Sequence, residues 1–105
     1  MVSKFILVFD DVMVKQLRKV SKNKDLKVLI SKMLDRLELL GPLAGELLDP
    51  KLFLYEIKNM RPPIRLYYKH NKVNDEIYIF EFEMKTSTQK QKDTIKNLRN
   101  KYSKS

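Results

Sequence analysis

The sequence predicts an α+β domain in which a small, mostly antiparallel sheet packs helices on one face, with the element order β-α-α-β-β-β-α. Three observations predict it: an apolar run near the start, a long segment with apolar residues at steps of three and four, and three β-like segments separated by short, turn-prone stretches. The 105 residues have room for one domain, so we expect residues 1–105 to form a single unit.

The first expected elements are a strand and a short helix. Residues 5–9 form a continuous β-favouring run, which is typical of a strand buried on both faces. Asp10 and Asp11 follow this run and are suited to cap a helix over residues 12–20.

The second expected helix has the clearest pattern in the sequence. Apolar residues recur from Leu26 to Leu40 at steps of three and four, and Gly41 and Pro42 end the segment. We expect this stripe to pack within the domain's own core rather than to dock a partner helix. The turn-rich residues 42–51 then form a connector.

Three strands and a closing helix follow. We expect strands over residues 52–58, 64–69 and 76–85, joined by short turns into adjacent antiparallel hairpins. Residues 90–102 are expected to form the final helix, because three core residues recur there at helical spacing: Ile95, Leu98 and Tyr102.

The charge favours a partner that carries phosphates. Lys and Arg number 22 against 13 Asp and Glu, a formal net charge of +9 at pH 7. Residues 1–50 have net +2 and residues 51–105 net +7, so the second half is expected to face a polyanion. The longest apolar run has five residues, which excludes a membrane-spanning helix of about 20.

The scarcity of cysteine and histidine excludes several kinds of site. The chain has no cysteine, which excludes a disulfide scaffold, a cysteine-ligated zinc site and a thiol nucleophile, and favours a cytoplasmic protein. A single histidine, His70, excludes a three-histidine metal site, and we expect neither metal nor cofactor. His70 falls in a predicted turn, where we expect a solvated loop residue.

Alternation along the strands predicts one polar sheet face. If Lys58 pairs near Arg65 across the first hairpin, this face carries Glu56, Lys58, Arg65, Tyr67 and Lys69.

The same alternation divides the last strand into two sides. One side is expected to carry Tyr78, Phe80, Phe82 and Met84. The other is expected to carry Ile77, Ile79, Glu81, Glu83 and Lys85.

The polar face is suited to cleaving RNA. A carboxylate, Glu81 or Glu56, can take the proton of a ribose 2′-hydroxyl, while three cations stabilise the phosphorane charge: Arg65, Lys58 and Lys85. Arg65 is the stronger candidate for the phosphate, because a planar guanidinium can bind two oxygens at once. The alternative is a solvated sheet face on which Glu and Lys pair across strands.

Three short motifs follow one another along this predicted topology. They are LYEIK at residues 54–58, RLYY at 65–68 and FEMKT at 82–86, with a basic helix beyond them. Together they resemble the RelE/ParE toxin superfamily of type II toxin–antitoxin systems, and within it the HigB-like, phage-derived branch. The resemblance covers about residues 50–102.

This resemblance implies a toxin that cleaves mRNA while it is translated on the ribosome. It also implies a cognate antitoxin, acidic or helix-turn-helix, encoded next to the toxin gene. Carried over by motif, Arg65 would contact the scissile phosphate, with Lys58 and Lys85 as flanking basic positions. Two alternatives stay open: a ParE-like toxin that binds DNA gyrase and cleaves no RNA, and a noncatalytic basic RNA-binding module.

Two residues depart from the family pattern. Phe80 stands where many HigB-like sequences have histidine, so a histidine base is not expected unless the distant His70 supplies it. Met84 replaces the first lysine of the Lys-Lys pair. These departures motivate the noncatalytic alternative.

Further RNA contacts are expected around the catalytic residues. Arg61 would hold backbone phosphate from the hairpin tip, and Tyr67 would stack on a base, whereas Tyr68 would belong to the core. Lys69 is also expected to bind RNA. Nonspecific attraction to ribosomal RNA would come from the last helix, through Lys90, Lys92, Lys96, Arg99 and Lys101. An ordinary exposed helix face is the alternative for the helix cations.

Overall fold

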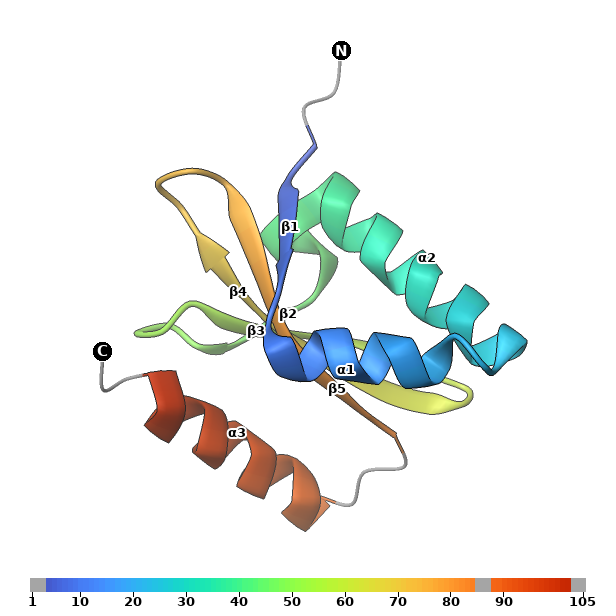
Figure 1. Cartoon of the computed structure of the whole chain (residues 1–105). Helices are drawn as coiled ribbons and strands as arrows, with labels where there is room; N and C mark the ends of the chain where they lie inside the picture. Colours follow the sequence, from blue (N-terminus) through green and yellow to red (C-terminus); the bar gives the residue numbers. More distant parts are fainter. Residues whose placement is uncertain (1–3, 85–87, 103–105) are drawn as a thin grey trace.

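The computed structural model describes residues 4–84 and 88–102, and within them it confirms the predicted α+β class (Figure 1). The chain-order elements are β1 (Ile6–Phe9), α1 (Asp11–Val20), α2 (Lys24–Leu40), the 3-10 helix η1 (Gly41–Ala44), β2 (Glu46–Asp49), β3 (Leu54–Met60), β4 (Pro63–Asn71), β5 (Glu76–Met84) and α3 (Thr88–Tyr102). Lys85 and the side chain of Tyr102 lie outside the described part, so their expected roles stay predictions.

The five strands form one mixed sheet in the order β1-β5-β4-β3-β2. β1 is parallel to β5, and the other neighbours are antiparallel. The expectation that β1 is buried on both faces is wrong. Leu7 and Phe9 pack on the core beneath α1 and α2, but Ile6 is exposed, because the core beneath α3 includes no residue of this edge strand.

β2 is a strand that the sequence did not predict. Residues 42–51 were expected to be a connector, but they contain part of η1 and the four residues of β2, which pair with β3. The sequence signal is weak because the segment is short, lacks apolar alternation and is flanked by turn residues. Pairing with the edge of β3 supplies the strand's hydrogen bonds, so tertiary structure decides its conformation.

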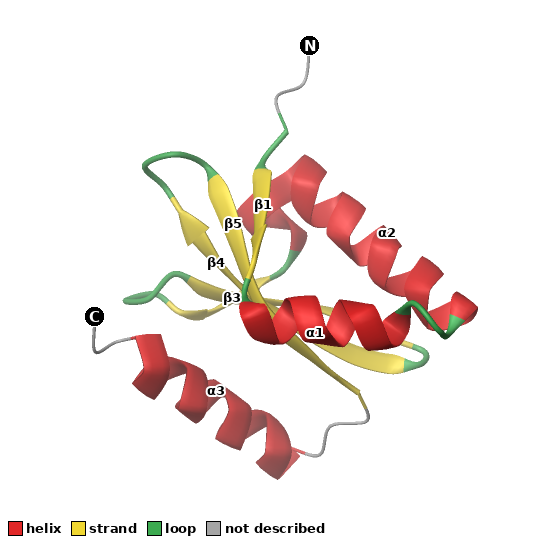
Figure 2. Ribbon diagram, viewed as in Figure 1, coloured by secondary structure: helices red, strands yellow, loops and turns green. Residues whose placement is uncertain are grey.

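Helices cover both faces of the sheet (Figure 2). α1 and α2 cover one face, over a core that includes Met13, Leu37, Leu66 and Tyr68. α3 covers the other, where Leu98 packs with Leu54, Tyr67 and Phe80. The expectation that all helices pack on one face is therefore wrong for α3, because the middle strands present large apolar groups on both of their faces.

An irregularity in β5 changes which side chains share a face. The pairing of β4 with β5 shifts between Tyr67 and Tyr68, opposite Glu81 and Ile79, so Phe80 is an extra residue. Ile79, before the bulge, packs on the α1–α2 core, and beyond the bulge Phe82 and Met84 pack on the same core. The predicted grouping of Phe82 and Met84 with Phe80 is wrong, because a bulge inverts the alternation that follows it.

Two short polar side chains begin the first two helices. Asp10 accepts a hydrogen bond from Val12 N at 2.9 Å, as expected for an N-cap, and also from the Tyr78 hydroxyl at 2.7 Å. Asn23 caps α2 by accepting from Leu26 N at 3.2 Å. The Tyr78 bond ties the start of α1 to β5.

Gly45 is required by a close approach of two backbones. A Cβ atom at this position would lie 2.1 Å from the carbonyl oxygen of Glu56 and 2.8 Å from the hydroxyl of Tyr68. Backbone cannot move as a flexible side chain would, so no larger residue fits between η1 and β3 without a shift of the chain.

We therefore expect Gly45→Ala to lower the free energy of unfolding by about 1–3 kcal/mol, the usual cost of overpacking. Urea denaturation followed by circular dichroism measures this change. Ser31→Ala, an exposed position in α2, is the matched control, with an expected change within about 0.5 kcal/mol. Equal effects of the two substitutions would contradict the steric account.

Candidate functional site

The site lies on the sheet face beneath α3, where β3 and β4 run side by side. The predicted register is confirmed: Lys58 pairs with Arg65, and Glu56 with Tyr67. Because side chains of directly paired residues share a face, this register brings Glu56, Lys58 and Arg65 together.

An ion pair between Arg65 and Glu56 forms the centre of the site. Arg65 Nη1 donates to both carboxylate oxygens of Glu56, at 3.1 and 3.2 Å. The Glu56 side chain is 4% exposed and that of Arg65 is 27% exposed, so the pair is largely withdrawn from water. The buried carboxylate therefore holds the guanidinium in a fixed place at the surface of the site.

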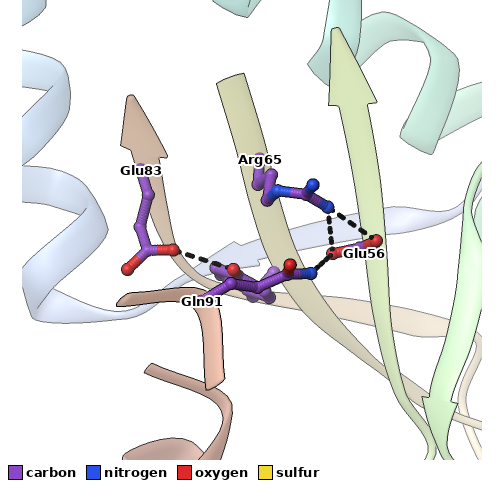
Figure 3. A network of polar contacts seen from close by, with 5 residues as sticks. Glu56, Arg65, Glu83 and Gln91 are labelled. Atoms are coloured by element: carbon purple, nitrogen blue, oxygen red, sulfur yellow. Dashed lines mark hydrogen bonds and ion pairs between the residues drawn. The ribbon is translucent and has the colours of Figure 1, made fainter. Parts of the chain in front are cut away.

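α3 completes this network from above the sheet (Figure 3). Gln91 Nε2 donates to Glu56 Oε2 at 3.1 Å. Thr94 Oγ1 donates to Glu83, which also accepts from the Tyr67 hydroxyl at 2.8 Å. Two buried carboxylates on the sheet thus each receive a hydrogen bond from α3.

Sequence reasoning did not select Gln91, Thr94 or Glu83 as site residues. Gln91 precedes Ile95 and Leu98 by four and seven positions, so helical spacing places it on the buried side of α3. Alternation had placed Glu83 on the polar face, and the pairing sets it opposite Arg65. These signals are in the sequence, but they identify site residues only when α3 is known to cover this face of the sheet.

Tyr67 is buried beneath α3 instead of being available to a base. It is 0% exposed, and its hydroxyl is bound to Glu83. Burial, and then the hydrogen bond and charge of Glu83, raise the pKa of Tyr67 far above its usual range. The expectation that Tyr67 stacks on a base is therefore wrong for this arrangement, whereas Tyr68 belongs to the core, as predicted.

Glu81 is a candidate proton acceptor, because its surroundings raise its pKa. It is half-buried, and burial raises its pKa, with a further contribution from the negative charge of Glu83. A carboxylate with a raised pKa is a better base than an ordinary one. In the pairing of β4 with β5, Glu81 lies opposite Tyr67, whereas Glu83 lies opposite Arg65. Glu81 is therefore two residues further along β5 from the position opposite Arg65.

Lys58 is exposed beside the central pair. It lines a hollow of about 220 Å³ together with Arg36, Glu46 and Glu56. It also lines a smaller hollow of about 110 Å³ together with Arg65. Lys58 is thus the described cation that lies next to Arg65 with its charge open to solvent.

The expected RNA-binding residues lie in three separate places. Arg61 is exposed at the tip between β3 and β4, while Lys69 is half-buried nearer the other end of β4. Lys90, Lys92, Lys96 and Lys101 are exposed on α3. Arg99 is also exposed, but its Nε donates to Asp49 at 2.8 Å, which ties α3 to β2.

The two departures from the family motifs have structural explanations. Phe80 is 3% exposed and packs beneath α3, with its ring edge-on to Tyr78. Met84 packs on the α1–α2 side of the sheet, away from Arg65, because the bulge in β5 inverts its orientation. At these positions the chain uses apolar side chains for packing.

His70 does not lie in a solvated turn, so that expectation is wrong. It belongs to β4, which continues to Asn71, and its side chain is only 11% exposed. Its ring lies edge-on to Phe5, and Nε2 is 3.4 Å from Asp75 Oδ1. The longer strand, one of nine residues, carries His70 into a packed position remote from the Arg65 pair.

Residues 4–84 and 88–102 contain neither a metal-binding cluster nor a membrane-spanning helix. No group of three or more His, Asp or Glu side chains there is arranged to hold a metal ion. No helix in the same ranges has the length and apolar character needed to cross a membrane.

The fold is that of RelE toxins. The isolated E. coli RelE toxin is 21% identical, with a TM-score of 0.61 over 90% of this chain and 98% of that one. A double arginine-to-alanine mutant of E. coli RelE in the free state has 20% identity and a TM-score of 0.66 over 90% and 97%.

The fold is also similar to a Mycobacterium tuberculosis toxin–antitoxin complex, RelBE2. That structure has 14% identity and a TM-score of 0.64, over 83% of this chain and 98% of that one. No protein-family model and no curated protein matches the sequence.

Tyr67→Phe is expected to lower the free energy of unfolding by about 1–3 kcal/mol, because it leaves a buried carboxylate one donor short. Urea denaturation measures this loss. Tyr55→Phe is the control: Tyr55 stacks on Tyr68 at 5.3 Å, and its hydroxyl has no hydrogen bond within the described residues. A loss of similar size in the control would argue against the Glu83 contact as the cause.

Glu81→Gln is expected to stabilise the protein near pH 7 but not in acid. A raised pKa means that the folded state disfavours the charged carboxylate, a penalty that applies above the ordinary carboxylate pKa and disappears once the group is protonated. The difference in unfolding free energy between variant and wild type should therefore shrink below about pH 4. Urea titrations at both pH values measure it, and a difference independent of pH would contradict the assignment.

Proposed function

We propose that this protein is the toxin of a type II toxin–antitoxin system and cleaves mRNA during translation on the ribosome. The observation that carries the proposal is the Arg65–Glu56 pair, set on paired strands of a RelE fold. The net charge of +9 supports a phosphate-bearing substrate. The motifs at residues 54–58 and 65–68 support the HigB-like branch.

The proposed reaction is an intramolecular attack within the RNA strand. The ribose 2′-oxygen attacks the adjacent phosphorus, the bond from phosphorus to the 5′-oxygen breaks, and a cyclic phosphate and a 5′-hydroxyl result. The 2′-hydroxyl proton passes to a base on the protein, and the leaving oxygen takes up a proton. This chemistry needs a base, an acid and cations that stabilise the phosphorane.

The base and the phosphate-binding cations have candidates in the described site. Arg65 would bind the phosphate oxygens, since its guanidinium is held in place but remains partly exposed. Glu56, buried against Arg65 and Gln91, is better suited to position the guanidinium than to take a proton. Glu81, with its raised pKa, is the proposed base, and Lys58 would stabilise charge beside Arg65.

The proposed partners follow from this function. The ribosome would position the mRNA, since a domain of 105 residues offers little surface for reading a long RNA alone. A cognate antitoxin would neutralise the toxin, and two of the similar structures are toxin–antitoxin complexes. The site of action would be the cytoplasm, where mRNA is translated.

Arg65→Lys is expected to reduce mRNA cleavage by about 10²–10³-fold, the usual loss when one group that stabilises a transition state is removed. The lysine keeps a positive charge beside Glu56, so the fold should survive, whereas Arg65→Ala would strand a buried carboxylate. Primer extension on a transcript in a translating extract measures the cleavage.

The matched control is Lys51→Arg, a charge-preserving exchange at an exposed position outside the site. This variant should cleave mRNA at the same rate as the wild-type protein. Intact transcripts with the wild-type protein would overturn the nuclease function. DNA damage without mRNA cleavage would instead indicate a gyrase-binding toxin.

A further inference from the structure

Positive charge is concentrated in α1 and α2, although the first half of the chain as a whole has a small net charge. Residues 12–34 contain seven Lys and Arg against one acidic residue, Asp25, a net charge of +6. The first 50 residues have only net +2, because the remaining acidic residues lie before residue 12 or after residue 34. The sequence expectation that the second half alone faces a polyanion is therefore incomplete.

Six of these cations surround the turn between α1 and α2. We name them the hairpin patch: Lys15, Arg18, Lys19, Lys22, Lys24 and Lys27. All six are exposed, and none forms an ion pair within the described part of the chain. Six cations and a single acidic residue, Asp25, on one short segment attract a polyanion strongly.

The patch stands on elements that are fixed to the sheet. Gln16 donates to Phe82 O at 2.9 Å and accepts from Phe82 N at 3.0 Å, which fastens α1 to β5. Pro62 lines a hollow of about 190 Å³ with Asn23 and Asp25, so the tip between β3 and β4 lies against the α1–α2 turn (Figure 1). The exposed Arg61 on this tip extends the patch.

We propose that the hairpin patch is a second RNA-binding surface, which holds the phosphate backbone of double-helical RNA. The proposal rests on the proposed function and names the kind of RNA that docks the protein beside its substrate. Residues 12–34 contain no aromatic residue, whereas surfaces that bind single strands stack bases on aromatic rings. Backbone contact with a duplex needs only correctly spaced cations.

The position of the patch separates docking from cutting. α1 and α2 pack on one face of the sheet, and the Arg65–Glu56 pair lies on the other, beneath α3. One side of the sheet can therefore hold structured RNA while the other meets the strand to be cut.

An acidic protein segment is the competing class of partner. Lys19 lines an apolar hollow with Val20, Leu26 and Phe82 that such a segment could enter. The lining of this hollow includes none of the other five cations of the patch. The spread of charge over two helices and a turn is better explained by a row of phosphates.

The test measures binding of the full-length protein to an RNA duplex of about 16 base pairs, the length that double-stranded RNA-binding domains span. The variant is Lys19→Gln/Lys22→Gln/Lys24→Gln. The slope of log K against log salt concentration should decrease by about 3, one unit for each lost phosphate contact. Thermal melts check that the exposed substitutions preserve the fold.

The control is Lys4→Gln/Lys51→Gln/Lys72→Gln, which removes the same charge from exposed positions outside the patch. Its slope should change by less than about 1. Equal changes in both variants would overturn the proposal, because net charge alone would explain them. Unchanged duplex binding with weakened binding to polyglutamate would overturn it in favour of an acidic protein partner.

This experiment does not depend on cleavage. The duplex is not translated, so its binding is measured whether or not the protein cuts mRNA. Loss of the proposed nuclease function would appear in the extract assay, and failure of the hairpin patch would appear only in the salt slopes.

Discussion

Two carboxylates buried between the sheet and α3 impose the constraint on which the site depends. Glu56 and Glu83 are 4% and 8% exposed, and a buried carboxylate is costly unless it is ion-paired or hydrogen-bonded. Arg65 and Gln91 satisfy the first, and Tyr67 and Thr94 the second. Among the described residues no buried side-chain nitrogen or oxygen lacks a partner. The buried Glu56 carboxylate therefore determines where the Arg65 guanidinium lies.

The bulge in β5 allows this arrangement to coexist with apolar packing on both faces of the sheet. Before the bulge Ile77 and Ile79 face α1 and α2, and after it Phe82 does the same. Without the extra residue, Phe82 would turn toward α3, and Glu83 would turn toward the core beneath α1 and α2, away from its donors Tyr67 and Thr94. One inserted residue thus keeps the apolar groups in the core and the acidic group beside Arg65.

Much of the site was predictable from local pattern. Alternation and a short turn were sufficient to pair Lys58 with Arg65 and to set Glu56 on the same face. The role of α3 was not predictable, since the apolar spacing of Ile95 and Leu98 says that the helix packs but not on which face. Tyr67 is buried because α3 covers this face, so the prediction that Tyr67 is available to stack on a nucleobase was wrong.

The sequence by itself determined the element types, the hairpin register and the residues of one polar strand face, because these depend on periodicity and turn chemistry between near neighbours. Tertiary structure decided which face α3 covers, that residues 46–49 pair as a strand, and where the bulge falls. These outcomes depend on contacts between segments far apart in the chain, and local spacing carries no information about them.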